Sequence, residues 1–352
     1  MSEISIKLAA GTNVGLVRKN NEDNFVVNRD LCQSEWIIPQ SIEPISLGRY
    51  GSILVVADGM GGTNAGEVAS AIAIETVQNA FTPENLGDII TQEGIVTSEE
   101  AVEEFLGRTV KTADLNIVNA SKEDSSTQGM GTTIVIAWIL NDKAYICWCG
   151  DSRCYVFNGN SGFCRLSKDH SYVQDLVDQG KLDPENAFDH PYSNIITRCL
   201  GDPTNRSYPD FRSYNLKDGD TLLLCSDGLC GLCHDEEIMQ IIEENQDDLM
   251  TCKDRLIEAA LEAGGYDNIT IVLCHIMLQD TEPKAKLNNT VFSKPNHHKI
   301  RKILLLLLVL ALAAGFYLYR NPQQYAKWKT ILYQADTVLV TETDTTNTTL
   351  TD

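Results

Sequence analysis

Basic residues are scarce in this 352-residue chain: 28 lysines and arginines stand against 49 aspartates and glutamates, so the formal net charge is −21. A surface that binds nucleic acid needs a positive field to displace counterions from the phosphates. The composition therefore argues against a nucleic-acid partner. It suits a protein that gathers divalent cations.

The chain also lacks the marks of an exported, disulfide-bonded protein. Its first residues, MSEISIKLAAG, have neither the charged start nor the apolar core of a signal peptide. Most of the eleven cysteines lie in apolar runs such as YICWCG and LLLCSDG. This pattern predicts buried free thiols in a reducing compartment. No internal repeat is present, and the 43% hydrophobic content is normal for a chain with a real core.

One long apolar run is present, at residues 303–319, and its seventeen residues carry no charge. As a helix it would span about 26 Å, the short end of the transmembrane range. A core helix of a globular domain usually has a polar face, which this run lacks. Basic residues at 297–302 precede it. We therefore expect a single-pass protein of the cell membrane with its larger N-terminal part in the cytoplasm.

Composition divides the rest of the chain. Residues 1–278 alternate apolar runs with amphipathic stretches and predict one compact catalytic domain. Residues 279–302 are first polar, with two prolines, and then basic, which predicts a linker. Residues 320–352 end in TETDTTNTTLTD, which predicts a disordered, Thr-rich tail.

Strands and helices within the compact domain separate by their periodicity. Strands are expected in SILVVAD, in a hairpin of TTIVIAWIL and KAYICWCG closed at Asn141–Asp142, in TLLLCSD and in NITIVLCHIML. Helices are expected at 65–81, 99–121, 234–245 and 249–263. Because the helices come in sequential pairs and do not alternate with every strand, the order predicts an α+β fold of antiparallel sheets covered by helices.

Carboxylates stand at the ends of several expected strands. The set is Asp58, Asp151 and Asp227, with Asp267 at the mouth of the last strand and Glu22 and Asp23 in RKNNEDN. A single one would most simply be a turn former. Four or more would meet in one cleft if the sheets align. Like charges there would repel and take up protons unless a cation lay among them.

The residue types indicate which cation. Apart from Cys225, no histidine or cysteine lies within these motifs, and a twelve-residue calcium loop is absent. Carboxylate and carbonyl oxygens favour Mg²⁺ or Mn²⁺ over zinc. Two such ions can activate a water for attack on phosphorus, and Arg18 could hold the phosphate oxygens. Phosphate hydrolysis is the chemistry that these residues predict.

Taken together, the motifs resemble a known family. RKNNEDN, ADGMGG, GMGTT, GDSR, LSKDHS, NIITRCLG, CSDGL and GGYDNIT occur in the order and approximate spacing of the bacterial-type, metal-dependent type 2C (PPM family) serine/threonine protein phosphatases. The resemblance covers residues 5–278. It implies an α-β-β-α sandwich of two antiparallel sheets flanked by helix pairs. It also implies an enzyme that acts on phosphorylated proteins, the targets of a serine/threonine kinase, and the run at 303–319 adds the expectation of a membrane anchor.

The resemblance also implies a metal centre of two tightly bound Mn²⁺ or Mg²⁺ ions, with a third, weaker ion in bacterial members. By match to DGMGG, Asp58 resembles the ligand that bridges both metals and Gly59 the carbonyl ligand. Asp227 in SDG and Asp267 in DNIT resemble ligands of the first metal. Asp151 in GDSR resembles the ligand of the third.

Two further residues and one segment match catalytic features of the family. Asp23 resembles the acidic residue that holds metal-bound water, and Arg18 resembles the phosphate-binding arginine. Residues of about 171–198 match the variable flap beside the cleft. One position departs: Met60 stands where some members, chiefly eukaryotic, have a histidine that is a candidate general acid. Methionine cannot donate a proton, so the identity of the acid stays open.

Several alternatives remain. CGLCH (230–234) fits a haem-attachment pattern or a redox cysteine pair, and His170 could act as an acid or base or lie in a helix cap. The whole chain could be a catalytically weak, membrane-anchored phosphoprotein-binding module on the same fold, although its intact carboxylate set argues against that. It could also be a phosphatase acting on a sigma-factor antagonist, a type that often carries sensory domains ahead of the catalytic motifs.

Overall fold

The computed structural model of the protein describes residues 3–33, 35–36, 43–61, 65–202 and 207–279. Contacts divide the chain into the units Met1–Glu282 and Pro283–Asp352, and all described residues belong to the first. Within these ranges no helix is long and apolar enough to cross a membrane. The predicted linker from residue 280 on, the predicted membrane span at 303–319 and the predicted tail lie outside the described residues.

Two large antiparallel sheets form the centre of the fold. The first has the order β10-β9-β12-β13-β1-β3, with the bounds Gly162–Arg165, Arg153–Asn158, Thr221–Cys225, Ile269–Gln279, Glu3–Asn13 and Ile45–Ser46. The second has the order β11-β8-β7-β4-β2, with the bounds Asp210–Asn215, Lys143–Cys149, Ile134–Leu140, Ser52–Ala57 and Asn24–Asn28. The short strands β5 (Gly59–Met60) and β6 (Gly131–Thr132) pair separately.

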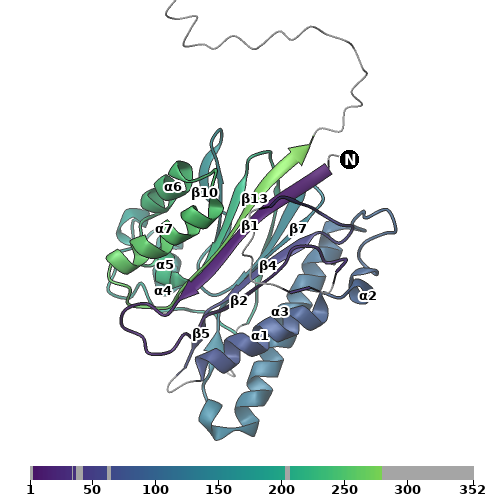
Figure 1. The fold of residues 1–352 in the computed structure, drawn as a ribbon. Coiled ribbons are helices and arrows are strands. Elements are labelled where there is room, and N and C mark those ends of the chain that lie inside the picture. The colour runs from purple at the N-terminus through teal and green to yellow at the C-terminus, as the bar shows by residue number, and fades with distance from the viewer. Residues whose placement is uncertain (1–2, 34, 37–42, 62–64, 203–206, 280–352) are drawn as a thin grey trace, which may run out of the picture. The chain divides into compact units, whose positions relative to one another are not determined.

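Helices cover both outer faces of the sheet pair (Figure 1). On the five-stranded sheet lie α1 (Gly66–Ala80) and α3 (Glu99–Glu123), with the short α2 (Pro83–Leu86). On the six-stranded sheet lie α5 (Asp227–Cys230), α6 (Asp235–Glu244) and α7 (Leu249–Glu262). A third apolar cluster fills the space between the sheets. The predicted α+β fold of two antiparallel sheets with outer helices is confirmed.

The continuous apolar run of β4 reflects burial on both faces. Ile53 and Val55 pack toward α1 and α3, whereas Leu54 and Val56 pack between the sheets. Successive side chains of a strand point to opposite faces, so a strand in the middle of this sandwich needs apolar residues throughout. Its end is therefore held firmly, which fixes the position of the residue that follows, Asp58.

Local signals mark several element ends. The Ser98 side chain accepts a hydrogen bond from the Ala101 amide at the start of α3, and Asp248 caps α7 in the same way. Asn141 adopts φ 54° in the turn between β7 and β8, a left-handed conformation that asparagine tolerates. The predicted hairpin turn is confirmed, and the predicted helices differ from the observed ones by only one or two residues at their ends.

Candidate active site

Five aspartates converge where strands of both sheets end. Asp23 precedes β2, Asp58 follows β4, Asp151 follows β8, Asp227 opens α5 directly after β12, and Asp267 precedes β13. Their charges act on one another. Burial raises the pKa of Asp58 well above its ordinary value, and the charges of Asp23, Asp227 and Asp151 raise it further. The structure thus brings together carboxylates that lie more than 200 residues apart in the sequence.

Burial and mutual repulsion disfavour the charged forms throughout this carboxylate cluster. Burial raises the pKa of Asp23 from 3.8 to about 7. It also raises the pKa of Asp151 and of Asp227, and the neighbouring aspartate charges add to both shifts. Asp58, Asp151 and Asp227 are half-buried, and Asp151 and Asp227 line the pocket described below. At neutral pH such a cluster needs a cation to hold its full charge.

Two carboxylate oxygens of the cluster are left without a hydrogen-bond partner among the residues that the structure describes. Within the described residues, Asp23 Oδ1 and Asp227 Oδ1 are buried and have no hydrogen-bond partner. Buried polar atoms are normally paired because an unpaired one is costly. Oxygen donors of this kind fit a hard divalent cation such as Mn²⁺ or Mg²⁺. The described part of the chain nevertheless contains no three His, Cys, Asp or Glu side chains already close enough together to hold one ion.

Asp58 is held from both sides by the threonines of GMGTT. Its backbone oxygen accepts hydrogen bonds from the Thr133 amide at 2.8 Å and from Thr132 Oγ1 at 2.9 Å, and its amide donates to Thr133 Oγ1 at 3.1 Å. Thr133 Oγ1 also lies 2.7 Å from Ser152 Oγ, next to Asp151. The backbone around Asp58 and the turn that carries Asp151 are therefore fixed relative to each other.

Gly59 lies where no side chain fits. A Cβ atom on it would stand 2.3 Å from the Gly66 carbonyl oxygen and 2.5 Å from that of Glu22. The Gly59 amide itself donates to the Glu22 oxygen at 3.2 Å. The start of α1 and the loop that carries Asp23 thus pack directly on the backbone after Asp58, and only glycine permits this approach.

The predicted phosphate-binding arginine and one predicted metal ligand are paired with each other. Arg18 Nη2 donates to Asp267 Oδ2 at 2.6 Å, and the two side chains are 50% and 32% exposed. Asn268 anchors the loop of Arg18: its Nδ2 donates to the Val14 and Asn20 oxygens at 3.0 Å each. Arg18 keeps further N–H donors at the open edge of the cluster, where they can meet an anion.

Asp151 is followed closely by a half-buried arginine, Arg153, that joins several elements. Arg153 donates to both carboxylate oxygens of Asp169, at 2.7 to 3.1 Å, and through Nη1 to Tyr155 Oη at 2.8 Å. Arg165 also pairs with Asp169, at 3.4 Å, and reaches Gln174 at 3.1 Å. This chain of contacts connects the turn after β8 to the segment beyond it, 171–198.

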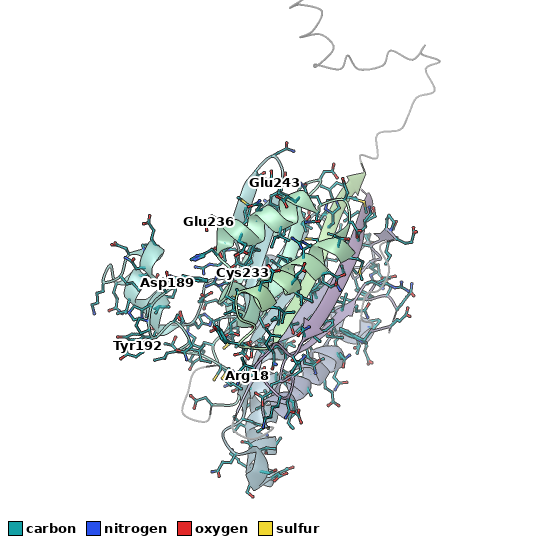
Figure 2. All side chains as sticks on the ribbon, turned by 60° about the vertical axis from the view of Figure 1, so that its left-hand side comes forward. Arg18, Asp189, Tyr192, Cys233, Glu236 and Glu243 are labelled. Atoms are coloured by element: carbon teal, nitrogen blue, oxygen red, sulfur yellow. The ribbon has the colours of Figure 1, made fainter. Side chains whose placement is uncertain are left out.

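That segment, predicted as the flap, contains α4 (Tyr172–Asp178) and the short helix Pro184–Asn186. Figure 2 shows Asp189 and Tyr192 on this flap, which projects to the side of Cys233 and of α6 with Glu236. A pocket of about 750 Å³ lies between the flap and α5–α6, and its lining includes three of the cluster aspartates, Asp151, Asp227 and Asp267.

His170 has a structural position. Its ring is buried and stacks on Trp148, its Nδ1 accepts from the Gly150 amide at 3.1 Å, and its Nε2 lies 3.3 Å from Asp210. Burial lowers its pKa, which favours the neutral ring. The helix cap predicted in DHS is supplied by Ser171, whose side chain accepts from the Gln174 amide. His170 therefore supports the turn before Asp151.

The cysteines of CGLCH are buried and free. A hydrogen bond to Cys225 and burial raise the pKa of Cys230 well above its ordinary value, and burial raises that of Cys233 to about 12. Thiols this reluctant to ionise are poor nucleophiles. Eight of the chain's eleven cysteines are buried and none is in a disulfide, so the predicted buried free thiols are confirmed. Met60 lies in β5 beside Gly59 and adds no titratable group.

Four positioning residues were not predicted. Thr133 holds the Asp58 backbone, and Asn268 holds the loop of Arg18. Arg153 ties the turn after Asp151 to Asp169, and Ser226 Oγ donates to Asp23 Oδ2 at 2.7 Å. Each stands inside one of the recognised motifs, within one or two residues of a carboxylate or as part of GMGTT. Their place in the motifs was a signal, but which backbone group each one contacts depends on the tertiary fold.

Comparison with known proteins agrees with this fold. A profile of the family described as "Protein phosphatase 2C" matches residues 44–262. "Serine/threonine phosphatase stp" of Listeria monocytogenes serotype 4b is 34% identical over 264 residues, which cover 74% of this chain and 92% of that protein. The crystal structure of the Mycobacterium tuberculosis serine/threonine phosphatase PstP/Ppp is similar with a TM-score of 0.60 and 30% identity, covering 77% of this chain and 98% of that chain.

A further structure carries metal. It is the catalytic domain of the serine/threonine protein phosphatase PstP in complex with two manganese ions, similar with a TM-score of 0.60 and 29% identity over 78% of this chain and 99% of that chain. These matches, together with the fold, define the class: this is a phosphatase with two antiparallel sheets between helices. The chain belongs to the protein phosphatase 2C family, as the eight motifs predicted.

Proposed function

We propose that this protein phosphatase removes phosphate from phosphoserine and phosphothreonine of proteins and depends on two Mn²⁺ or Mg²⁺ ions. The observation that carries the proposal is the carboxylate cluster, in which two oxygens have no hydrogen-bond partner among the described residues and one member, Asp267, is paired with an exposed arginine. The serine/threonine specificity named for the Listeria and Mycobacterium relatives, and the manganese pair in the PstP structure, support it.

The residues that would hold the ions follow from the cluster and the family motifs. Asp58 would be a ligand of both ions, and the Gly59 carbonyl would be a further ligand. Asp227 and Asp267 would complete the first site, and Asp151 would bind a third, weaker ion. When bound, the ions supply an activated water and neutralise the charge of the phosphate. Asp267 would have to share its carboxylate between the metal and Arg18.

Side chains of the protein itself would bind the phosphate and orient a water. Arg18 presents the remaining N–H groups of its planar fork to the phosphate oxygens, at the open edge of the cluster. Asp23 has one oxygen fixed by Ser226 and the other unpaired, so the unpaired oxygen can orient a water or hold a proton. Met60 cannot supply the proton of the leaving alkoxide, so that proton must come from a water or from another group of the cluster.

Hydrolysis of phosphopeptides tests the proposal. We expect the purified full-length chain with Mn²⁺ to release inorganic phosphate from phosphoserine and phosphothreonine peptides at least ~10-fold faster than from a phosphotyrosine peptide of the same sequence. EDTA should abolish the release. A chain that binds these phosphopeptides tightly in Mn²⁺ but releases no phosphate would instead be the binding module considered from the sequence.

We further propose that residues 303–319 anchor the protein in the cell membrane with the phosphatase domain in the cytoplasm. The proposal rests on the length and uniform hydrophobicity of this run and on the basic residues at 297–302.

Membrane fractionation checks the anchor. Full-length protein should stay in the membrane after carbonate extraction, whereas a chain ending at residue 280 should be soluble. A periplasm-dependent phosphatase reporter fused after Asp352 should be active, and the same reporter fused at residue 285 should be silent. Recovery of the full-length chain in the soluble fraction would contradict the proposed anchor, and the reverse reporter pattern would contradict the proposed topology.

A further inference from the structure

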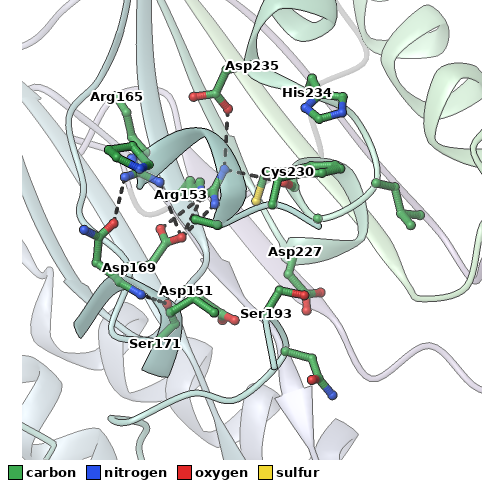
Figure 3. Close-up of a pocket in the computed structure, with 18 of the residues that line it drawn as sticks. Asp151, Arg153, Arg165, Asp169, Ser171, Ser193, Asp227, Cys230, His234 and Asp235 are labelled. Carbon is green, nitrogen blue, oxygen red and sulfur yellow. Dashed lines mark hydrogen bonds and ion pairs between the residues drawn. The ribbon is translucent and has the colours of Figure 1, made fainter. Parts of the chain in front are cut away.

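The pocket between the flap and the body of the protein opens directly onto the carboxylate cluster. One wall comes from the flap and includes Val173, Val177 and Phe188; the other comes from β9, α5 and α6. Figure 3 shows Arg153 in the middle of the second wall, between Asp169 and Asp235, with Asp151 and Asp227 farther along the pocket. Its volume of about 750 Å³ is far larger than a phosphate needs.

The two arginines of this pocket are already neutralised. Arg153 is bound through both oxygens of Asp169, and its Nη1 also lies 3.4 Å from Asp235. Arg165 pairs with the same Asp169 and with Gln174. Asp235 additionally accepts from Tyr155 Oη at 2.8 Å. The pocket therefore offers no free cation, among its described residues, to a second anion.

Outside the aspartate cluster, two carboxylates of the lining have no such partner among the described residues. Glu185 on the flap and Glu236 in the first turn of α6 are exposed, and neither has a hydrogen bond or ion pair to a described residue. They come from opposite walls. Those walls meet where the Phe188 ring of the flap stacks on His234, with 3.9 Å between the ring centres. Glu185 lies three residues before Phe188 and Glu236 two residues after His234, so the stack joins the two stretches of chain that carry these carboxylates.

A helix start by itself would explain an acidic residue in α6, because negative charge is favourable near a helix N-terminus. Asp235, Glu236 and Glu237 all stand in that first turn. Only Asp235 and Glu236 line the pocket, however, and the helix that contains Glu185, Pro184–Asn186, is only three residues long. Glu237 is thus a natural control for the helix effect.

We propose that this pocket docks a cationic side chain of the phosphoprotein substrate, a lysine or arginine close in sequence to the phosphorylated residue. The proposal rests on the proposed phosphatase function. Its support is charge complementarity: the apolar wall suits the methylene stem, and Glu185 and Glu236 suit the charged head. Because Asp227 and Asp267 line the same pocket, the cation and the phosphate would lie within a few residues of each other on one peptide.

A peptide series with matched variants tests the docking. One phosphothreonine peptide is made with a single arginine at each position from three before to three after the phosphothreonine, and with alanine as the reference. We expect arginine at one or two positions to raise kcat/KM about fivefold over alanine at low ionic strength, with the gain falling as salt rises. In E185Q/E236Q the arginine-to-alanine ratio should fall to about one. The ratio is taken within each variant, which cancels any change in the amount of active enzyme.

The double variant D189N/E237Q serves as control. It also removes one negative charge from the flap and one from the first turn of α6, but at positions that do not line the pocket. It should keep the arginine preference. Loss of the preference in both double variants, or no preference in the wild type, would overturn the docking proposal. Wild-type hydrolysis of p-nitrophenyl phosphate separates the two claims: without it the proposed function fails, and with it but without an arginine preference only the docking site fails.

Discussion

Asp58→Asn should lower kcat for p-nitrophenyl phosphate with saturating Mn²⁺ by at least ~10³-fold, about 4 kcal/mol of activation free energy. The substitution removes one negative charge from the centre of the carboxylate cluster and keeps the size of the side chain. The contacts of Thr132 and Thr133 go to the Asp58 backbone, so they persist in the variant and the fold should be retained. Steady-state kinetics, with circular dichroism as the check on folding, measure the effect.

Asp142→Asn is the matched control, because Asp142 is an exposed carboxylate in the turn between β7 and β8. It should change kcat less than twofold, since a surface substitution away from the cluster has little to disturb. A folded Asp58→Asn protein that keeps more than a tenth of the wild-type rate would contradict the role of Asp58 at the centre of the site.

The metal-free protein should lose stability as the pH rises, and Mn²⁺ should reverse the loss. The pKa of Asp23 is raised to about 7 in the folded chain, so the folded state binds this proton more tightly than the unfolded state does. Stability is then highest below the unfolded pKa near 4 and falls as the pH rises toward 7. Asp23 alone should cost about 2 kcal/mol of unfolding free energy between pH 5.5 and 7.5. Burial raises the pKa of Asp58, Asp151 and Asp227 in the same direction.

Urea unfolding of the EDTA-treated chain at the two pH values measures this difference. Addition of Mn²⁺ at pH 7.5 should restore at least the lost stability, because a cation stabilises the ionised carboxylates and binds only the folded state. Asp58→Asn should weaken both the pH dependence and the response to Mn²⁺. A metal-free protein that is equally stable at both pH values would show that the cluster carries no such electrostatic cost.

The sequence predicted the fold class because the buried strands and amphipathic helices keep regular periods. The runs at β4, β7, β8, β12 and β13 are apolar on both faces, which identifies strands in the middle of a sandwich. The strands that were not predicted are β1, β2, β3, β5, β6, β9, β10 and β11. β10 and β11 lie at the sheet edges and mix polar with apolar residues, and β9 begins with Arg153 and ends with Asn158. Their pairing with distant strands decides their structure.

The site residues were predictable for a different reason: carboxylates at strand ends stand out against apolar runs, and glycines mark where backbone approaches them. The pairing of Arg18 with Asp267 was not predictable, since it joins loops 249 residues apart. Nor was the pocket beside the cluster, because it depends on how the flap packs against α5 and α6 through Phe188 and His234. Such contacts between distant loops leave no period in the sequence.

The central claim is that the carboxylate cluster holds a pair of divalent ions that hydrolysis requires. Anomalous X-ray diffraction from crystals of the manganese-loaded protein tests it most directly, because manganese can be located independently of the protein atoms. We predict two strong manganese peaks in the cluster, both in contact with Asp58, and no such pair in crystals of Asp58→Asn grown with the same metal. An active, manganese-loaded crystal form with no manganese at Asp58, or with its ions bound elsewhere on the chain, would contradict the account.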